Sequence, residues 1–97
     1  MSERVTVTEV GPRDGLQLIA QPVPTEAKIA WIKALHAAGL RDIEVGSFVS
    51  PRLVPQMADS AAVVAQALRI EGLTVYALAA NLKGAMAAYA AGAHVIV

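Results

Sequence analysis

Residues 5–17 read Val-Thr-Val-Thr-Glu-Val-Gly-Pro-Arg-Asp-Gly-Leu-Gln, and this stretch indicates the fold class of the chain. Its first six residues are rich in β-branched side chains, which favour a strand over 5–10. The Gly-Pro pair then ends the strand, and Gly15 permits unusual backbone angles. We therefore expect Arg13 and Asp14 to lie on a tight, pre-formed loop rather than in a helix. Spacing alone favours a functional site there no more than a solvated turn.

Strands and helices alternate through the rest of the chain. The apolar pattern predicts the order βαβαβαβ, with strands over 5–10, 43–45, 73–78 and 94–97 and helices over 25–38, about 60–69 and 82–91. Thr25 is the expected N-cap of the first helix and Gly39 its expected end, while Asp59 or Ser60 is expected to cap the second helix. Two prolines predict an irregular loop over 46–57.

This alternation predicts a parallel sheet with right-handed crossovers, either an open doubly wound sheet or part of a (β/α)₈ barrel. The sequence stops inside the apolar run 94–97, and four strands with their helices are half of an eight-stranded barrel. We therefore expect an α/β fold that forms the N-terminal half of a TIM barrel. Residues 1–97 would be a single partial domain of a truncated chain with open strand edges.

Composition excludes several classes of function. Net charge is zero and charged residues make up 16% of the chain, so we expect neither nucleic acid nor a membrane as a partner. No apolar run approaches the length of a membrane span, and we see no signal peptide, so we expect a cytoplasmic protein. The chain has no cysteine, so its chemistry must use oxygen, nitrogen or a hard cation.

Polar residues follow three of the predicted strands. They are Arg13 and Asp14 after the first, residues 44–50 at the end of the second, and residues 81–83 after the third. Ligands bind at the carboxyl ends of the strands in both candidate architectures. Three polar strand ends on one rim are stronger support for a site than any single motif.

Other residues fit structural roles better. We interpret Glu9 as a charge partner that supports Arg13 rather than as a catalytic group. His36 and His94 are not spaced as metal ligands, and we place them at the surface or rim. Trp31, together with Leu35, is expected to form a helix face that packs against the sheet.

Four blocks resemble 3-hydroxy-3-methylglutaryl-CoA lyases. They are Glu-Val-Gly-Pro-Arg-Asp-Gly-Leu-Gln at 9–17, Ile-Glu-Val-Gly-Ser-Phe-Val-Ser-Pro at 43–51, Val-Pro-Gln-Met at 54–57 and Asn-Leu-Lys-Gly at 81–84. The first block also resembles isopropylmalate and homocitrate synthases and carboxyltransferase domains. The second and third blocks point to the lyase.

The resemblance implies a TIM-barrel enzyme that uses Mg²⁺ or Mn²⁺ to split 3-hydroxy-3-methylglutaryl-CoA into acetyl-CoA and acetoacetate, in leucine catabolism and ketone body formation. Asp14 matches the metal-binding Asp of the family, and Arg13 matches its catalytic Arg, which also contacts substrate. Glu44 matches an active-site carboxylate. Gln17, Ser47 and Asn81 match positions expected near the acyl-CoA substrate.

The family's His-x-His and Asn metal ligands, and its Gly- and Cys-containing loop, have no counterpart in these residues. One carboxylate holds a divalent cation weakly, so we expect the isolated chain to be inactive. The resemblance fits a homo-oligomer. The alternatives are a related Claisen-type condensing or carboxyltransferase enzyme, and a non-catalytic half-barrel that associates through its open edges.

Overall fold

The computed structural model describes residues 7–15, 23–50, 52 and 54–97, and these form the predicted alternation of strands and helices. In chain order the elements are β1 (Thr8–Glu9), the π-helical turn η1 (Gly11–Gly15), α1 (Thr25–Ala37), β2 (Asp42–Phe48), the 3₁₀ turn η2 (Pro55–Met57), α2 (Ser60–Ala67), β3 (Thr74–Ala79), α3 (Leu82–Ala91) and β4 (Val95–Ile96).

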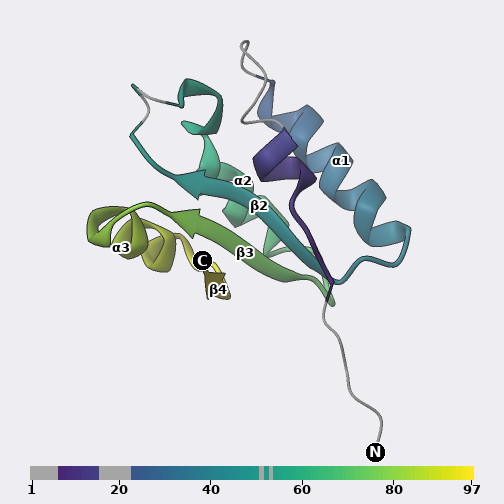
Figure 1. The fold of residues 1–97 in the computed structure, drawn as a ribbon. Helices are drawn as coiled ribbons and strands as arrows, with labels where there is room; N and C mark the ends of the chain where they lie inside the picture. The colour runs from purple at the N-terminus through teal and green to yellow at the C-terminus, as the bar shows by residue number, and fades with distance from the viewer. Residues whose placement is uncertain (1–6, 16–22, 51, 53) are drawn as a thin grey trace, which may run out of the picture.

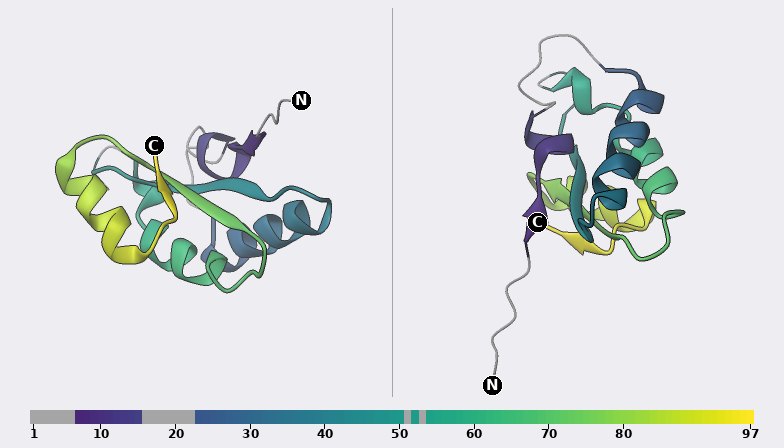
Figure 2. Two further views of the ribbon diagram at one scale, coloured as in Figure 1. Left: turned by 90° about the horizontal axis from the view of Figure 1, so that it is seen from below. Right: turned by 90° about the vertical axis from the view of Figure 1, so that its right-hand side faces the viewer.

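The four strands form one parallel sheet in the order β1-β2-β3-β4 (Figure 1). All three α-helices lie on the same face of this sheet, as the two turned views of Figure 2 show. Sequential parallel strands with helices on one face are the pattern of consecutive β/α units in a barrel wall. Within the described residues, the other face of the sheet carries no α-helix.

The hydrophobic core fills the space between the sheet and the helices. Its buried members come from the sheet and from all the described α-helices: Ile29 and Ile32 of α1, Ile43 and Val45 of β2, Val63, Val64 and Ala67 of α2, Val75 and Ala77 of β3, and Ala88 of α3. Alternate residues of β2 and β3 enter this core, as the two-residue period of a strand requires. The core therefore fixes which strand residues face away from the helices.

Several helix ends agree with the sequence. The third helix has the predicted bounds, and Gly92 ends it in the left-handed region with φ +95°. Gly39, with φ +107°, follows the end of α1, and its backbone N–H donates to the His36 carbonyl. An L-residue is strained at such angles, which is why glycine stands at both positions.

The predicted capping residue was wrong for the first helix and was confirmed only by position for the second. Pro24, not Thr25, is the N-cap of α1. The Thr25 hydroxyl instead donates to Asp59 Oδ2 at 2.6 Å, and Lys28 Nζ donates to Asp59 Oδ1 at 2.5 Å. Asp59 is the N-cap of α2 by position but makes no side-chain cap. The Asp59 carboxylate accepts hydrogen bonds from side chains of α1 instead, and these contacts join the two helices.

Some element bounds also differ from those predicted. The second strand continues past residue 45 to Phe48, and the expected irregular loop contains the turn η2. The second helix ends at Ala67, two residues early. The first and last strands are two residues each, and part of the first predicted strand lies outside the described residues.

Candidate functional site

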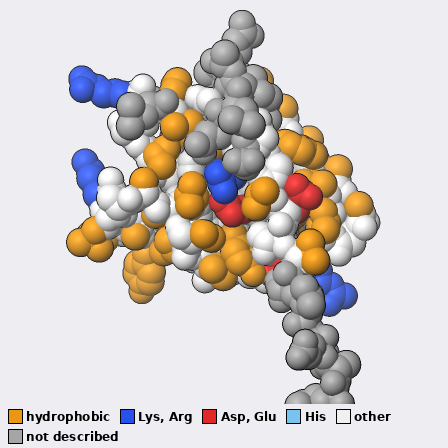
Figure 3. Space-filling view, in the orientation of Figure 1, with side chains coloured by type: hydrophobic (Ala, Val, Ile, Leu, Met, Phe, Trp, Pro, Cys, Tyr) orange, Lys and Arg blue, Asp and Glu red, His pale blue; other side chains and the backbone are white. Residues whose placement is uncertain are grey.

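Arg13 and Glu44, predicted as the catalytic pair of this chain, are in direct contact. Arg13 Nε donates to Glu44 Oε1 at 2.5 Å, across 31 positions of sequence. Their side chains are only 16% and 5% exposed. A charge pair shielded from water is stronger than one at the surface, and each partner fixes the other's orientation. Near the centre of the face shown in Figure 3, a basic side chain meets an acidic one among hydrophobic neighbours.

The turn η1 carries Arg13 to this contact. We predicted a tight loop outside any helix, but residues Gly11–Gly15 form a single π-helical turn. The Arg13 N–H donates to the Val10 carbonyl at 3.1 Å, and the Gly11 N–H donates to Glu9 Oε1 at 2.8 Å. Glu9 thus holds the turn that presents Arg13. Single turns of π-helix recur at functional sites in other proteins.

A β-bulge in β2 places the next candidate residue. Glu44 pairs with Tyr76 and Gly46 pairs with Ala77, so Val45 is an extra residue in the ladder. Val45 lies in the core, and a Cβ on Gly46 would sit 2.7 Å from Ser60 Oγ in α2. Two successive residues therefore face the helices.

The bulge reverses the alternation that follows it. Without it, Ser47 would share the helix-facing side with Ile43 and Val45. With it, Ser47 falls on the side of Glu44, while Phe48 packs against the core. We predicted neither the bulge nor the extension of the strand from the sequence. Gly46 is the residue that could have suggested them, because glycine within a strand often marks a bulge or a close approach.

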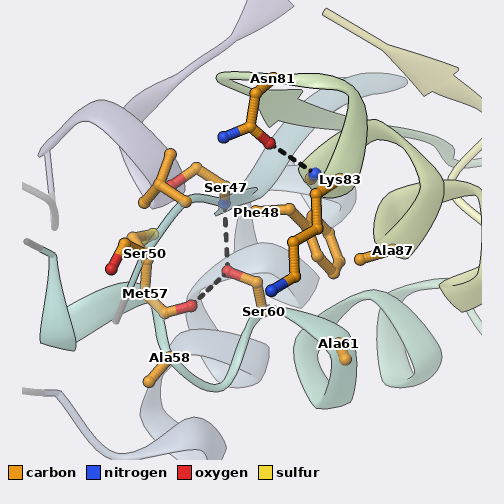
Figure 4. Close-up of a pocket in the computed structure, with 12 residues that line it drawn as sticks. Ser47, Phe48, Ser50, Met57, Ala58, Ser60, Ala61, Asn81, Lys83 and Ala87 are labelled. Carbon is orange, nitrogen blue, oxygen red and sulfur yellow. Dashed lines mark hydrogen bonds between the residues drawn. The ribbon is translucent and has the colours of Figure 1, made fainter. Parts of the chain in front are cut away.

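A cavity of about 560 Å³ lies beside the end of β2, between the first turns of α2 and α3 (Figure 4). Ser47 and Asn81, both predicted to contact substrate, line it. The Ser60 hydroxyl accepts from the Ser47 N–H at 3.1 Å and donates to the Met57 carbonyl at 2.7 Å. The sequence suggested Ser60 only as a possible helix cap, whereas its hydroxyl joins η2 to the strand end.

Asn81 also has a structural role. It is the N-cap of α3, and its Oδ1 accepts a hydrogen bond from the Gly84 N–H at 2.8 Å. Its Oδ1 is thus engaged within the helix cap, and the amide Nδ2 is its remaining polar group. Lys83 extends from the same turn across the cavity (Figure 4).

The remaining predicted site residues are only partly placed. Asp14 lies in η1 by its backbone, so it follows Arg13 at the same strand end, and Gln17 lies outside the described residues. Within the described part of the chain, no group of three or more His, Asp or Glu side chains is arranged to hold a metal ion.

His94 has a contact that the sequence did not suggest. The imidazole Nδ1 of His94 accepts a hydrogen bond from the Val75 N–H at 2.9 Å, and the backbone N–H of His94 donates to the Val75 carbonyl. The side chain thus completes the ladder at the start of β4.

Among the described residues, no helix is long and apolar enough to cross a membrane.

Comparison with known families gives the site its context. A family model described as HMGL-like matches residues 4–97. The chain belongs to the HMGL-like family. This membership confirms the resemblance that the four sequence blocks indicated.

Proteins named as lyases are similar to this chain in sequence and in structure. The 3-hydroxy-3-isohexenylglutaryl-CoA/hydroxy-methylglutaryl-CoA lyase of Pseudomonas aeruginosa is 53% identical over 92 residues, which are 95% of this chain and 31% of that protein. A crystal structure of hydroxymethylglutaryl-CoA lyase from Pseudomonas aeruginosa matches at 54% identity and a TM-score of 0.85, over 92% of this chain and 30% of the other.

A lyase structure from Acinetobacter baumannii, in complex with coenzyme A and 3-methylmalate, matches at 42% identity and a TM-score of 0.85 over 92% of this chain and 29% of the other. The chain thus spans about 30% of the length of these HMGL-like relatives. The likeness confirms the predicted fold class, the N-terminal part of a TIM barrel.

Proposed function

We propose that the protein carrying this chain is a hydroxymethylglutaryl-CoA lyase and that these residues supply one side of its active site. The buried pair of Arg13, in the turn after β1, and Glu44, within β2, carries this proposal, together with about 50% identity to lyases. A held guanidinium at a strand end suits a reaction that builds negative charge on an oxygen.

The proposed reaction is a retro-Claisen cleavage. The tertiary hydroxyl of the substrate loses its proton and becomes the ketone of acetoacetate. The carbon–carbon bond breaks, and its electron pair moves into the enolate of acetyl-CoA, which then takes up a proton. Arg13 would face the thioester oxygen, where the enolate charge collects.

In this scheme Glu44 fixes the guanidinium and belongs to the proton-transfer network. Arg13 Nε donates to Glu44 Oε1, and this contact would orient the guanidinium toward the substrate. Ser47 and Asn81 are proposed to contact the acyl-CoA at the cavity beside them, and Gln17 stays a predicted substrate contact.

A divalent cation, Mg²⁺ or Mn²⁺, is part of this proposal, and Asp14 is its proposed ligand from this chain. When bound, the cation would polarise the substrate's hydroxyl and carboxylate oxygens. We further propose a cytoplasmic homo-oligomer.

The test is an assay of acetoacetate release from 3-hydroxy-3-methylglutaryl-CoA by the complete protein, with Mg²⁺ or Mn²⁺ and after chelation. Activity that depends on the cation supports the proposal, and a complete protein without cleavage at any metal concentration refutes it. The isohexenyl homologue should be assayed in parallel, since the name of the 53% identical relative includes both substrates.

Asp14→Asn tests the ligand assignment. Loss of the carboxylate charge should raise the metal concentration for half-maximal activity at least about tenfold. In other sites, mutating a residue that only hydrogen-bonds to a metal ligand already has an effect of this size. Glu71→Gln, at an exposed position far along the chain, is the matched control. An unchanged metal titration in Asp14→Asn would refute the assignment.

A further inference from the structure

The indole of Trp31 lies against the turn that carries Arg13. A Cβ on Gly11 would sit 3.1 Å from Trp31 Cη2 and 3.2 Å from Cζ2, and a Cβ on Gly15 would sit 3.8 Å from Cη2. The outer edge of the ring therefore reaches both ends of the turn Gly11–Gly15. We had expected Trp31 to pack against the sheet, but its neighbour across the interface is η1.

The two glycines differ in how closely they approach the ring. The Cβ added on Gly11 would also sit 2.8 Å from Glu9 Oε1. Gly11 therefore lies between Glu9 and the indole, where a side chain could fit only if one of them moved. Gly15 has ordinary van der Waals space. The start of the turn is therefore held on two sides, by a carboxylate and by an aromatic ring.

Within the described residues, little regular structure adjoins the turn that carries Arg13. β1 is two residues long, so few ladder hydrogen bonds hold the segment before the turn. The described contacts of η1 include the burial of Pro12, the Glu9 cap, the Arg13–Glu44 pair and the Trp31 ring. A large rigid ring gives contact area at low entropic cost.

We propose that Trp31 is a positioning residue that keeps η1 in place and so holds the Arg13 guanidinium on Glu44. Its role in catalysis rests on the proposed function, whereas its effect on the Arg13–Glu44 contact does not. A misplacement of about 1 Å at a catalytic group can cost roughly 100-fold in rate, so a support at this distance from the reacting atoms is consequential.

The test uses Trp31→Phe in the complete protein. Phenylalanine keeps an aromatic ring on α1 but lacks Cζ2 and Cη2, the atoms that reach Gly11. The first readout is the NMR signal of the Arg13 Nε–H group, which reports its hydrogen bond to Glu44 directly. The second is the steady-state kinetics of lyase cleavage, with kcat and KM separated.

In Trp31→Phe we expect the Arg13 Nε–H signal to move toward that of a free arginine. We expect kcat to fall about tenfold with KM changed much less, since the guanidinium acts on charge formed during the reaction. Trp31→Ala should show both changes more strongly. Gly11→Ala, which pushes into Glu9 and the ring, should shift the same signal, whereas Gly15→Ala should leave it in place.

Leu35→Ala is the control for a general loss of stability, because Leu35 lies on the same helix and packs against the core rather than the turn. It should lower the Tm while the Arg13 signal and kcat persist. An unmoved Arg13 signal in both Trp31 variants would overturn the inference. A moved signal in a complete protein that shows no lyase activity would support the inference and refute the proposed function.

Discussion

The two faces of the sheet are built on different principles. On the helix-covered face, contacts are apolar and interchangeable in kind, and residues such as Ile32, Ile43 and Val75 are fully buried. On the opposite side, Arg13 meets Glu44, and a bulge in β2 determines which of the following residues share the side of Glu44. The first face needs only the right residue type, whereas the second needs particular residues in one register.

The largest expected effect separates the two faces by activity. Arg13→Gln should lower turnover of the complete enzyme by about 10²–10³, the range found when one charge-stabilising donor is removed. It should also cost about 1–3 kcal/mol of stability, because it leaves the buried Glu44 carboxylate without its partner. Steady-state kinetics and chemical unfolding measure the two effects.

The double variant Arg13→Gln/Glu44→Gln sharpens this prediction. Two neutral amides leave no unpaired buried charge, so stability should recover while turnover stays low. If the double variant regained activity, or Arg13→Gln turned over at a near-normal rate, the charge at this site would not serve catalysis.

The apolar face should respond in the opposite way. Ile32→Ala removes a side chain with no exposed surface and should lower the free energy of unfolding by about 2–5 kcal/mol. The folded fraction should keep its turnover per molecule. Leu82→Ala, at a side chain 76% exposed, is the control and should change stability by less than about 0.5 kcal/mol. Equal losses in both variants would contradict the assigned core.

The contact between α3 and the end of β2 should give a smaller effect. A Cβ on Gly84 would sit 2.3 Å from the Phe48 carbonyl oxygen, a backbone atom that cannot rotate away. Gly84→Ala should therefore cost about 1–3 kcal/mol by overpacking, against roughly 0.5–1 kcal/mol gained from helix propensity. Thermal unfolding measures the balance, with Met86→Ala on the exposed side of α3 as the control. A stabilised Gly84→Ala would show that this approach is looser.

The sequence predicted the apolar face better than the site. Alternation and glycine placement located the third helix to the residue and the end of the first, because local periodicity determines which side chains can be buried. The extension of β2 to Phe48 was missed because Gly46 and Ser47 carry no strand preference. Their pairing with β3 is a tertiary effect.

The sequence suggested candidate site residues but not how their side chains are arranged. Arg13 and Glu44 were selected separately, and nothing local shows that side chains 31 positions apart meet. The same limit applies to Lys28, 2% exposed, whose partner Asp59 was expected to cap a helix instead. Charge partners distant in sequence depend on strand order and helix packing, which the chain's periodicity does not specify.

The smallest expected effect concerns a hydrogen bond between β2 and β3, at Tyr76, the ladder partner of Glu44. The Tyr76 hydroxyl donates to Asp42 Oδ1 at 2.9 Å, and this hydrogen bond, with some burial, raises the pKa of Tyr76 above 10.0, while a contact with Thr8 opposes the shift. The folded state thus favours the neutral phenol. The stabilisation is complete below the unfolded pKa of about 10 and is lost as pH rises through the folded pKa.

Tyr76→Phe removes this ionisation. Its stability should be slightly lower than that of the parent at neutral pH, and the difference should shrink above about pH 10, where the parent loses the hydrogen bond. Unfolding curves between pH 7 and 11 test this, with Tyr89→Phe as the control at a side chain 79% exposed. A gap between Tyr76→Phe and the parent that stays constant across this range would mean that the Asp42 contact is not linked to ionisation.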